Sequence, residues 1–368
     1  MCIRDSPGPR LQSRRDDGQP SDYALHLLHR LEGDVHPCER MKGGRGREQV
    51  GHGSFGDGEE AALRMAESCD VMIEAFRPGV VDRLGVGYDA VAERNPSIVY
   101  ASLSAFGQDG PYAKKPAHDI ATQAYAGILS VNLGFDDKPA IPGLANADML
   151  TSMMGLSAVL MALYRRRDTG KGDYIDMAMM DSVIAAMPNN FGPVFAEKRP
   201  PNPKDERSWG GNAMYRIYET KDGKHIVLGG AEMHFAAAIL NKMGRPDLIP
   251  ICEPPPGPNQ DPAKEFLAET FISQTQEFWI NWFEDVDAAF APVNDLRQGA
   301  DDPQARHREM IIEDDRGWEH IGIPMKFRDE PGQLVFVLPG LGEHTEANLR
   351  KVGYSDDELA TMQEKGVF

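Results

Sequence analysis

Two short segments of this chain hold side chains that could carry chemistry. One is 115–120 (KPAHDI), which contains His118 and Asp119, and the other is 143–148 (GLANAD), which ends on Asp148. An imidazole with a reference pKa of about 6.5 can take up and release a proton near neutrality. A carboxylate can act as a base or can form a covalent adduct. The two segments therefore predict an enzyme.

Both groups are expected at the beginning of helices. Asp148 precedes a long apolar stretch, so it also suits a helix N-cap, a position that Asp favours. The two roles are compatible, because the positive end of a helix helps to keep a carboxylate ionised. The sequence alone leaves both roles open for Asp148.

The elements around these segments alternate between strands and helices from about Gly58 onward. Short buried strands are expected at 69–74, 97–103 and 174–179, and helices at 59–67, 80–84, 119–131, 148–167 and 181–187. The arginine-rich end of the long helix is followed by Gly170, a typical C-cap residue. This order indicates an α/β fold with a Rossmann-like, mostly parallel sheet in the domain 58–187.

A second, smaller α+β domain is expected after a proline-rich stretch. Residues 188–208 read as an extended crossover and 209–328 as the small domain, with a hairpin around 221–224 and helices at 231–243 and 266–283. Residues 329–368 are expected to return to the large domain, with a final helix at 356–364.

The first part of the chain, 1–57, has a different composition. It is rich in Arg, Gly, His and Ser, and it lacks the strand-like alternation of the rest. Its opening, MCIRDS, resembles translated sequencing adapter. We interpret 1–57 as a non-native or out-of-frame segment.

Bulk composition excludes several classes of protein. The 368 residues carry a formal net charge of −18, which disfavours a nucleic-acid partner. With 41% hydrophobic residues we expect a water-soluble chain and no membrane partner. The four cysteines show neither CxxC nor metal-ligand spacing, which favours a reducing, cytoplasmic compartment and no bound metal.

Several segments together resemble the class III CoA-transferases of the CaiB/BaiF type, a family that includes the α-methylacyl-CoA racemases. The resemblance covers most of the chain from Gly58. It rests on the order and spacing of 69–79 (CDVMIEAFRPG), 83–88 (RLGVGY), 107–112 (GQDGPY), 115–120, 143–148, 169–172 (TGKG), 291–293 (APV) and 341–345 (LGEHT). One departure is that 1–57 does not match the strand, turn and helix with which the family begins.

The resemblance implies roles for individual residues. Asp148 falls on the nucleophilic aspartate, which would form an acyl anhydride and then an aspartyl-CoA thioester. His118 falls on the histidine of the racemases, where the transferases more often have an aromatic residue. Glu232 matches a glutamate that racemases place near this histidine, and Asp119 would orient the same site.

The resemblance also implies the ligand and the assembly. Coenzyme A would enter as acyl-CoA, with a carboxylic acid as the second substrate. Arg77 and Arg83 would hold the CoA phosphates, a contact that guanidinium groups make well. Ala117, His118, Ile120 and Ala121 would line the pantetheine arm. The family forms an interlocked homodimer.

Three functions follow from these residues. The leading one is a CoA-transferase with Asp148 as covalent nucleophile, and the alternative is an α-methylacyl-CoA racemase or epimerase with His118 and Asp148 as its acid/base pair. The third is a truncated, non-catalytic remnant. A nicotinamide dehydrogenase is disfavoured, because no G-x-G-x-x-G follows a strand.

Overall fold

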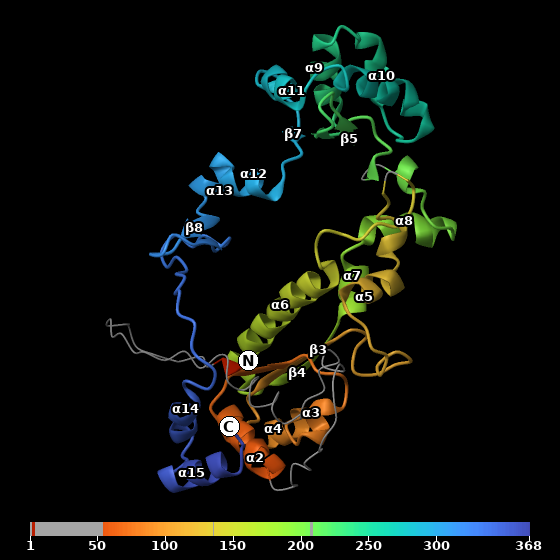
Figure 1. Cartoon of the computed structure of the whole chain (residues 1–368). Helices are drawn as coiled ribbons and strands as arrows, with labels where there is room; N and C mark the ends of the chain where they lie inside the picture. The colour runs from red at the N-terminus through yellow and green to blue at the C-terminus, as the bar shows by residue number, and fades with distance from the viewer. Residues whose placement is uncertain (1, 4–53, 135, 207–208) are drawn as a thin grey trace, which may run out of the picture. The chain divides into compact units, whose positions relative to one another are not determined.

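The computed structural model describes residues 2–3, 54–134, 136–206 and 209–368. These residues form two compact units, drawn in Figure 1. The large unit comprises Met1–Asn189 and Pro339–Phe368, and the small unit comprises Asn190–Leu338. The interpretation of 1–57 falls mostly outside the described residues and stays a prediction, although 54–57 already belong to helix α2 (Ser54–Glu67).

The sheet of the large unit has four strands in the order β1-β2-β3-β4. Strands β2 (Val71–Glu74), β3 (Val99–Ser104) and β4 (Asp173–Ala178) are parallel, and Tyr100 is in register with Met72 and Tyr174. Strand β1 (Cys2–Ile3) pairs with β2 in the antiparallel direction. The expected strands and the parallel sheet are confirmed.

Helices cover both faces of this sheet, as expected for an α/β fold. One face packs against α2, α3 (Val80–Arg83) and α4 (Tyr88–Arg94), a helix that the sequence analysis missed. The other face packs against α6 (Asn146–Thr169), and Figure 1 shows the two helical layers on opposite sides of β3 and β4. Successive strand residues alternate between the layers: Ile98 and Tyr100 contact one, and Val99 and Ala101 the other.

Helix α6 lies close to the sheet because its buried face is built from small side chains. That face consists of Ala147, Thr151, Gly155, Val159 and Ala162. The helix ends at Gly170, whose φ of 68° fits the expected C-cap. A half-buried ion pair of 2.7 Å between Arg166 and Asp70 fixes this end to the beginning of β2.

The length and apolar composition of α6 would also allow it to cross a membrane. It is the one helix in the described parts of the chain that passes this test, and 28% of its most apolar window is buried. One such helix is weak evidence of a membrane span, because the core helix of a protein without membrane spans passes the same test.

Two further helices of the large unit pack beside α6. Helix α5 (Asp119–Ala126) ends at Gly127, which has a φ of 89°, and a 3₁₀ turn, Ile128–Ser130, follows. The expectation of one helix over 119–131 is therefore wrong beyond Ala126, because the left-handed glycine ends the helix. Helix α7 (Met179–Ala185) follows β4 and contacts both α5 and α6.

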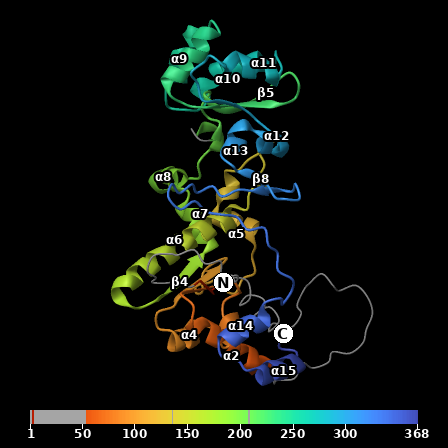
Figure 2. The same cartoon turned by 90° about the vertical axis from the view of Figure 1, so that its left-hand side faces the viewer.

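The end of the chain packs against helix α2 of the large unit. Helices α14 (Thr345–Lys351) and α15 (Asp356–Glu364) bury Leu349, Leu359 and Met362 together with Ala61 of α2. The expected final helix at 356–364 is confirmed, and Ser355 and Glu358 form a capping box at its beginning. Figure 2 shows α14 and α15 beside α2.

The stretch 188–208 is not extended throughout, as the sequence analysis expected. Its first half forms α8 (Pro188–Glu197), and a 3₁₀ turn, Pro203–Asp205, follows. Proline suits the first position of a helix, and Phe191 stacks on Phe195 one turn later, with 5.3 Å between the ring centroids. These local preferences favour a helix despite the internal Pro193.

The small unit contains a three-stranded antiparallel sheet of β5 (Tyr215–Glu219), β6 (His225–Gly229) and β7 (Phe290–Pro292). One of its faces packs on α9 (Met233–Lys242), α10 (Asp261–Phe271) and α11 (Gln276–Phe283). The expected hairpin at 221–224 is confirmed. The expectation of a single helix over 266–283 is wrong, because α10 ends at Phe271 and a new helix begins at Gln276, where the Thr275 side chain accepts from the N–H of Phe278.

The remainder of the small unit is built from short elements. These are the 3₁₀ helices Pro246–Cys252 and Pro258–Gln260, α12 (Leu296–Asp301), α13 (Pro303–His307), β8 (Ile311–Glu313) and β9 (Glu319–Ile321). Arg297 and Arg306 both bind Asp301 and Glu319, so one ion network joins α12, α13 and β9.

Candidate functional site

The carboxyl ends of the parallel strands place two of the sequence-derived segments at one edge of the large-unit sheet. The turn after β2 holds Arg77, and the loop after β3 leads to His118. Open α/β sheets bind their ligands at this edge. The loop is fixed to the sheet, since the N–H of Gln108 donates to Asp176 Oδ2 at 3.0 Å and the N–H of Gly107 donates to Ser104 Oγ at 3.0 Å.

The ammonium group of Lys115, packed against aromatic rings, fixes the end of the same loop. Lys115 Nζ donates a hydrogen bond to the hydroxyl of Tyr125 on α5, and it lies 4.9 Å from the ring centre of Tyr112 and 4.5 Å from that of Tyr125. Phe106 packs edge-on against both tyrosines. This cluster joins the loop to the last turn of α5.

His118 is the N-cap residue of α5, and its imidazole makes no capping hydrogen bond. Its carbonyl oxygen accepts from Thr122 Oγ1 at 3.1 Å, so the backbone at this position is anchored to the first turn. The residue is exposed. The backbone is thus fixed while the ring is accessible to a ligand.

Asp119 joins the starts of α5 and α6. Its Oδ1 accepts hydrogen bonds from the backbone N–H groups of Ala147, at 2.7 Å, and of Asp148, at 3.2 Å. The N-cap residue of α6 is Ala145, which has no side chain that could accept these bonds. The carboxylate of Asp119 therefore caps α6 from a neighbouring helix.

Asp148 is the third residue of α6, not its N-cap, so the capping role considered from the sequence is wrong. The residue is exposed overall, but neighbouring atoms desolvate its carboxylate in part. This desolvation, followed by the negative charge of Asp119, raises the pKa of Asp148, and the charge of His118 opposes the change. A raised pKa makes this carboxylate more basic than an ordinary aspartate.

Two residues of this cluster were missed from the sequence. Gln123 is fully buried and its Nε2 donates to Asp119 Oδ2 at 2.6 Å, while Asn146 Nδ2 lies 3.5 Å from Gln123 Oε1. The spacing of Asp119 and Gln123, four residues apart on one helix, was a usable signal, because such pairs face each other.

The expected CoA-binding residues lie in the large unit. Arg77 precedes Gly79, the N-cap residue of α3, which has a φ of 81°. Arg83 is the last residue of α3, and its Nη1 donates to the Gly79 carbonyl at 3.0 Å. Both arginines are exposed. Ala117 precedes the cap of α5, and Ile120 and Ala121 lie in its first turn. Glu232 belongs to the small unit, where it is the N-cap residue of α9.

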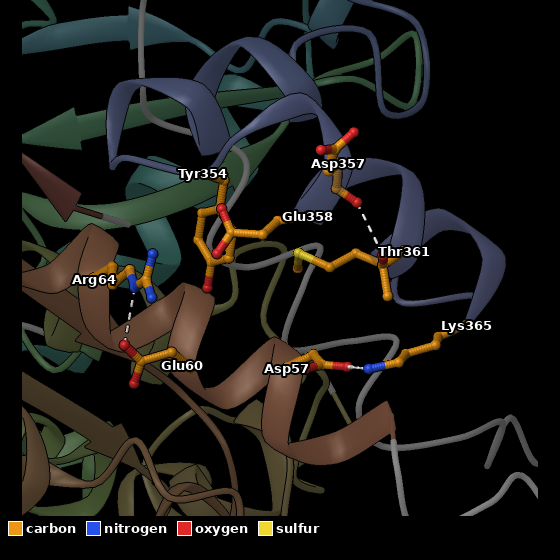
Figure 3. Close-up of a pocket in the computed structure, with 9 residues that line it drawn as sticks. Asp57, Glu60, Arg64, Tyr354, Asp357, Glu358, Thr361 and Lys365 are labelled. Atoms are coloured by element: carbon orange, nitrogen blue, oxygen red, sulfur yellow. Dashed lines mark hydrogen bonds and ion pairs between the residues drawn. The ribbon is translucent and has the colours of Figure 1, made fainter.

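A separate pocket of about 320 Å³ lies between α2 and α15. Figure 3 shows its charged lining, including the ion pair between Asp57 and Lys365 and the pair between Glu60 and Arg64. None of the proposed site residues lines it. Within the described ranges, no group of three or more His, Cys, Asp or Glu side chains is arranged to hold a metal ion.

Comparisons with known proteins identify the family of this chain. The family described as CoA-transferase family III matches residues 54–345. The chain is 30% identical to an acetyl-CoA:oxalate CoA-transferase of Acetobacter aceti, over 73% of this chain and 70% of that protein. It is 29% identical to an alpha-methylacyl-CoA racemase of Mus musculus, over 81% and 79%.

A solved structure shares the fold. The crystal structure of a CAIB/BAIF family protein from Brucella suis is 26% identical, covers 80% of this chain and 79% of its own, and superposes with a TM-score of 0.68. With the family match over most of the chain, this protein belongs to CoA-transferase family III.

Proposed function

We propose that this protein transfers CoA from a donor acyl-CoA to an acceptor carboxylate, with Asp148 as the nucleophile. One observation carries the proposal: Asp119 caps the N–H groups at the start of α6, so the exposed Asp148 carboxylate in the first turn is not needed as a cap. Membership in a family with CoA-transferases among its members supports the same reaction.

The proposed reaction proceeds by exchange between carboxylate and thiolate. The Asp148 carboxylate attacks the donor carbonyl, the C–S bond breaks, and a mixed anhydride forms with release of CoA thiolate. The thiolate then attacks the Asp148 carbonyl of the anhydride and releases the donor acid, which leaves an aspartyl-CoA thioester. The acceptor carboxylate attacks this thioester, the C–S bond breaks, and a second mixed anhydride forms between Asp148 and the acceptor as CoA thiolate leaves. The thiolate then attacks the acceptor carbonyl of this anhydride, which yields acceptor-CoA and restores the Asp148 carboxylate.

The remaining residues of the large-unit site are proposed to bind CoA. The guanidinium groups of Arg77 and Arg83 suit its phosphates, and both are exposed near the carboxyl end of β2. Ala117, His118, Ile120 and Ala121 would line the path of the pantetheine arm to Asp148. CoA thus serves as a substrate carrier, and no metal takes part in the proposed reaction.

A racemase is the second candidate, and the position of His118 favours it. The exposed imidazole of His118 is close enough to the carboxylate of Asp148 to lower its pKa. One group would remove the α-proton of a 2-methylacyl-CoA, and the other would return a proton to the opposite face. Asp119 would hold this pair in place, and Glu232 would assist His118.

A deuterium experiment separates the two functions. We expect the full chain, incubated with 2-methylacyl-CoA and a panel of carboxylic acids in deuterated water, to form new acyl-CoA thioesters without deuterium at the α-carbon. Mass spectrometry of the thioesters gives both readouts. Deuterium uptake without new thioesters would support the racemase, and the absence of both reactions would contradict both proposals and favour the non-catalytic remnant.

A homodimer is part of the proposal, and the outward face of α6 supports it. Met149, Met153, Leu156, Leu160 and Tyr164 follow one another at intervals of three or four residues and are 46–71% exposed. They lie opposite the small residues that face the sheet, so α6 is apolar on both sides. An interlocked second copy, as the family resemblance implies, would bury this face.

We expect Leu160→Glu to convert a dimer into monomers, because a charge at the centre of a buried apolar interface is not compensated. Light scattering should then report a mass near the 40.6 kDa of one chain, against twice this value for the wild type. Arg167→Gln, with the same charge change at the end of α6, is the matched control. A monomeric wild-type protein would refute the dimer.

A further inference from the structure

The carboxylate that caps α6 is itself held by a buried amide. Asp119 uses Oδ1 for the N–H groups of Ala147 and Asp148, and its Oδ2 accepts from Gln123 Nε2 at 2.6 Å. Gln123 has no exposed surface. The two oxygens of one carboxylate thus have separate partners, and the amide fixes the rotation of the carboxylate about its Cβ–Cγ bond.

The other end of the Gln123 amide also points to α6. Its Oε1 lies 3.5 Å from Nδ2 of Asn146, the first residue of the helix. The first three residues of α6 therefore contact α5 through Asp119 and Gln123. Buried polar side chains are costly unless both their donors and their acceptors find partners. Here the donor goes to Asp119 of α5, the residue that caps α6, and the acceptor faces Asn146 of α6.

We propose that Gln123 is a positioning residue for Asp148: through Asp119 it fixes the first turn of α6 and, with it, the place of the Asp148 carboxylate. The inference rests on the proposed function only in that Asp148 carries the chemistry. Gln123 touches neither substrate nor the reacting atoms. Its effect is transmitted by the cap, because the backbone of Asp148 is one of the two donors to Asp119.

The arrangement also sets the electrostatics at Asp148. The charged groups that act on its carboxylate are Asp119, which raises its pKa, and His118, which lowers it. The N–H groups that Asp119 occupies would otherwise stabilise negative charge at the helix start. If Asp119 turns away, Asp148 loses a repelling neighbour and gains these donors, so its pKa falls for two reasons.

The test is Gln123→Met in the full chain, a change that keeps the size of the side chain and removes both polar ends. We expect the pKa of Asp148 to fall in a ¹³C NMR titration of the aspartate carboxylates, assigned with Asp148→Asn. The amides of Ala147 and Asp148 should exchange faster. The kcat for CoA transfer should fall about 10–100-fold with KM nearly unchanged, as expected when a reacting group is displaced slightly.

Thr151→Val is the matched control. It removes another buried hydrogen bond near the start of α6, from Thr151 Oγ1 to the Ala147 carbonyl at 2.7 Å, without touching the cap. It should lower the melting temperature and leave the pKa of Asp148 unchanged. Equal effects of Thr151→Val and Gln123→Met on this pKa and on kcat, or no effect of Gln123→Met on either, would overturn the proposal.

Gln123→Glu is a second variant that tests the same proposal if Gln123→Met folds poorly. Near neutral pH its carboxylate would face that of Asp119 and displace the cap. Burial and the adjacent negative charge raise the pKa of such a group, so as the pH falls Glu becomes protonated and its O–H can donate to Asp119. The activity of this variant relative to wild type should therefore recover at lower pH, and a constant ratio would count against positioning.

The inference and the proposed function can fail separately. If the wild type neither transfers CoA nor exchanges the α-proton, the proposed function is wrong. The NMR titration and amide exchange still test whether Gln123 positions Asp148, because neither measurement depends on turnover.

Discussion

Replacing Asp148 by Ala should abolish CoA transfer and α-proton exchange together. In the transfer reaction the carboxylate forms the covalent bond, and in racemisation it is one of the two acid/base groups. Removing a nucleophile typically lowers kcat by about 10⁴-fold or more. The measurement is kcat for both reactions with the same acyl-CoA, together with the affinity for CoA, which should be retained.

A covalent adduct gives a second, more direct readout for Asp148. With donor acyl-CoA and no acceptor acid, the wild type should accumulate CoA linked as a thioester to the peptide that contains Asp148, and mass spectrometry should detect it. Asp168→Asn, which removes an exposed carboxylate from the other end of α6, is the control and should behave like the wild type. An Asp148→Ala protein that still transfers CoA would refute the mechanism.

Replacing His118 by Gln should separate the two candidate reactions. Racemisation requires a group that exchanges protons on one face of the α-carbon, and loss of such a group costs about 10²–10⁴-fold. The anhydride route removes no α-proton, so transfer should retain most of its rate. The readouts are deuterium at the α-carbon and the formation of new thioesters, measured on the same sample.

The His118 variant should also shift the pH profile of transfer. The charge of His118 lowers the pKa of Asp148, so its loss should raise that pKa further. The carboxylate must be ionised to attack, and the acid limb of kcat/KM should therefore move to higher pH. His307→Gln, at an exposed position of α13, should leave the profile unchanged. An equal loss of both reactions in His118→Gln would contradict the separation.

Local signals in the sequence were sufficient for most elements of the large unit. Short buried runs with β-favouring residues predicted β2, β3 and β4, and Gly170 predicted the end of α6. These signals act over a few residues, because β preference is a property of individual side chains and a left-handed C-cap needs glycine. The order of the strands and helices then indicated the parallel sheet.

Local signals did not predict the structure correctly where the preferences of neighbouring residues favour different backbone conformations. Pro and Asn suggested an extended 188–208, but Pro188 at the first helical position and the stacked pair Phe191 and Phe195 favour a helix. Gly127 ended α5 earlier than its apolar pattern indicated. In each case a backbone or packing preference of one residue outweighed the periodicity of its neighbours.

The candidate site also has features that the sequence predicted and features that only the structure shows. The types and spacing of His118 and Asp148, together with the resemblance of their segments, were enough to name them from the sequence. The sequence also placed each group at a helix start. It could not show that Asp119 accepts from the backbone of Ala147 and Asp148, or that Gln123 holds Asp119 from a buried position.

The sequence by itself therefore determined the parallel α/β fold and predicted the reactive groups, since both inferences depend on residue type and local spacing. Only the tertiary structure decided which residue caps α6, which face of α6 is left apolar and exposed, and how Asp148 is positioned. The reason is physical: these features depend on hydrogen bonds and packing between α5, α6 and the sheet, which are separated along the chain and meet only after folding.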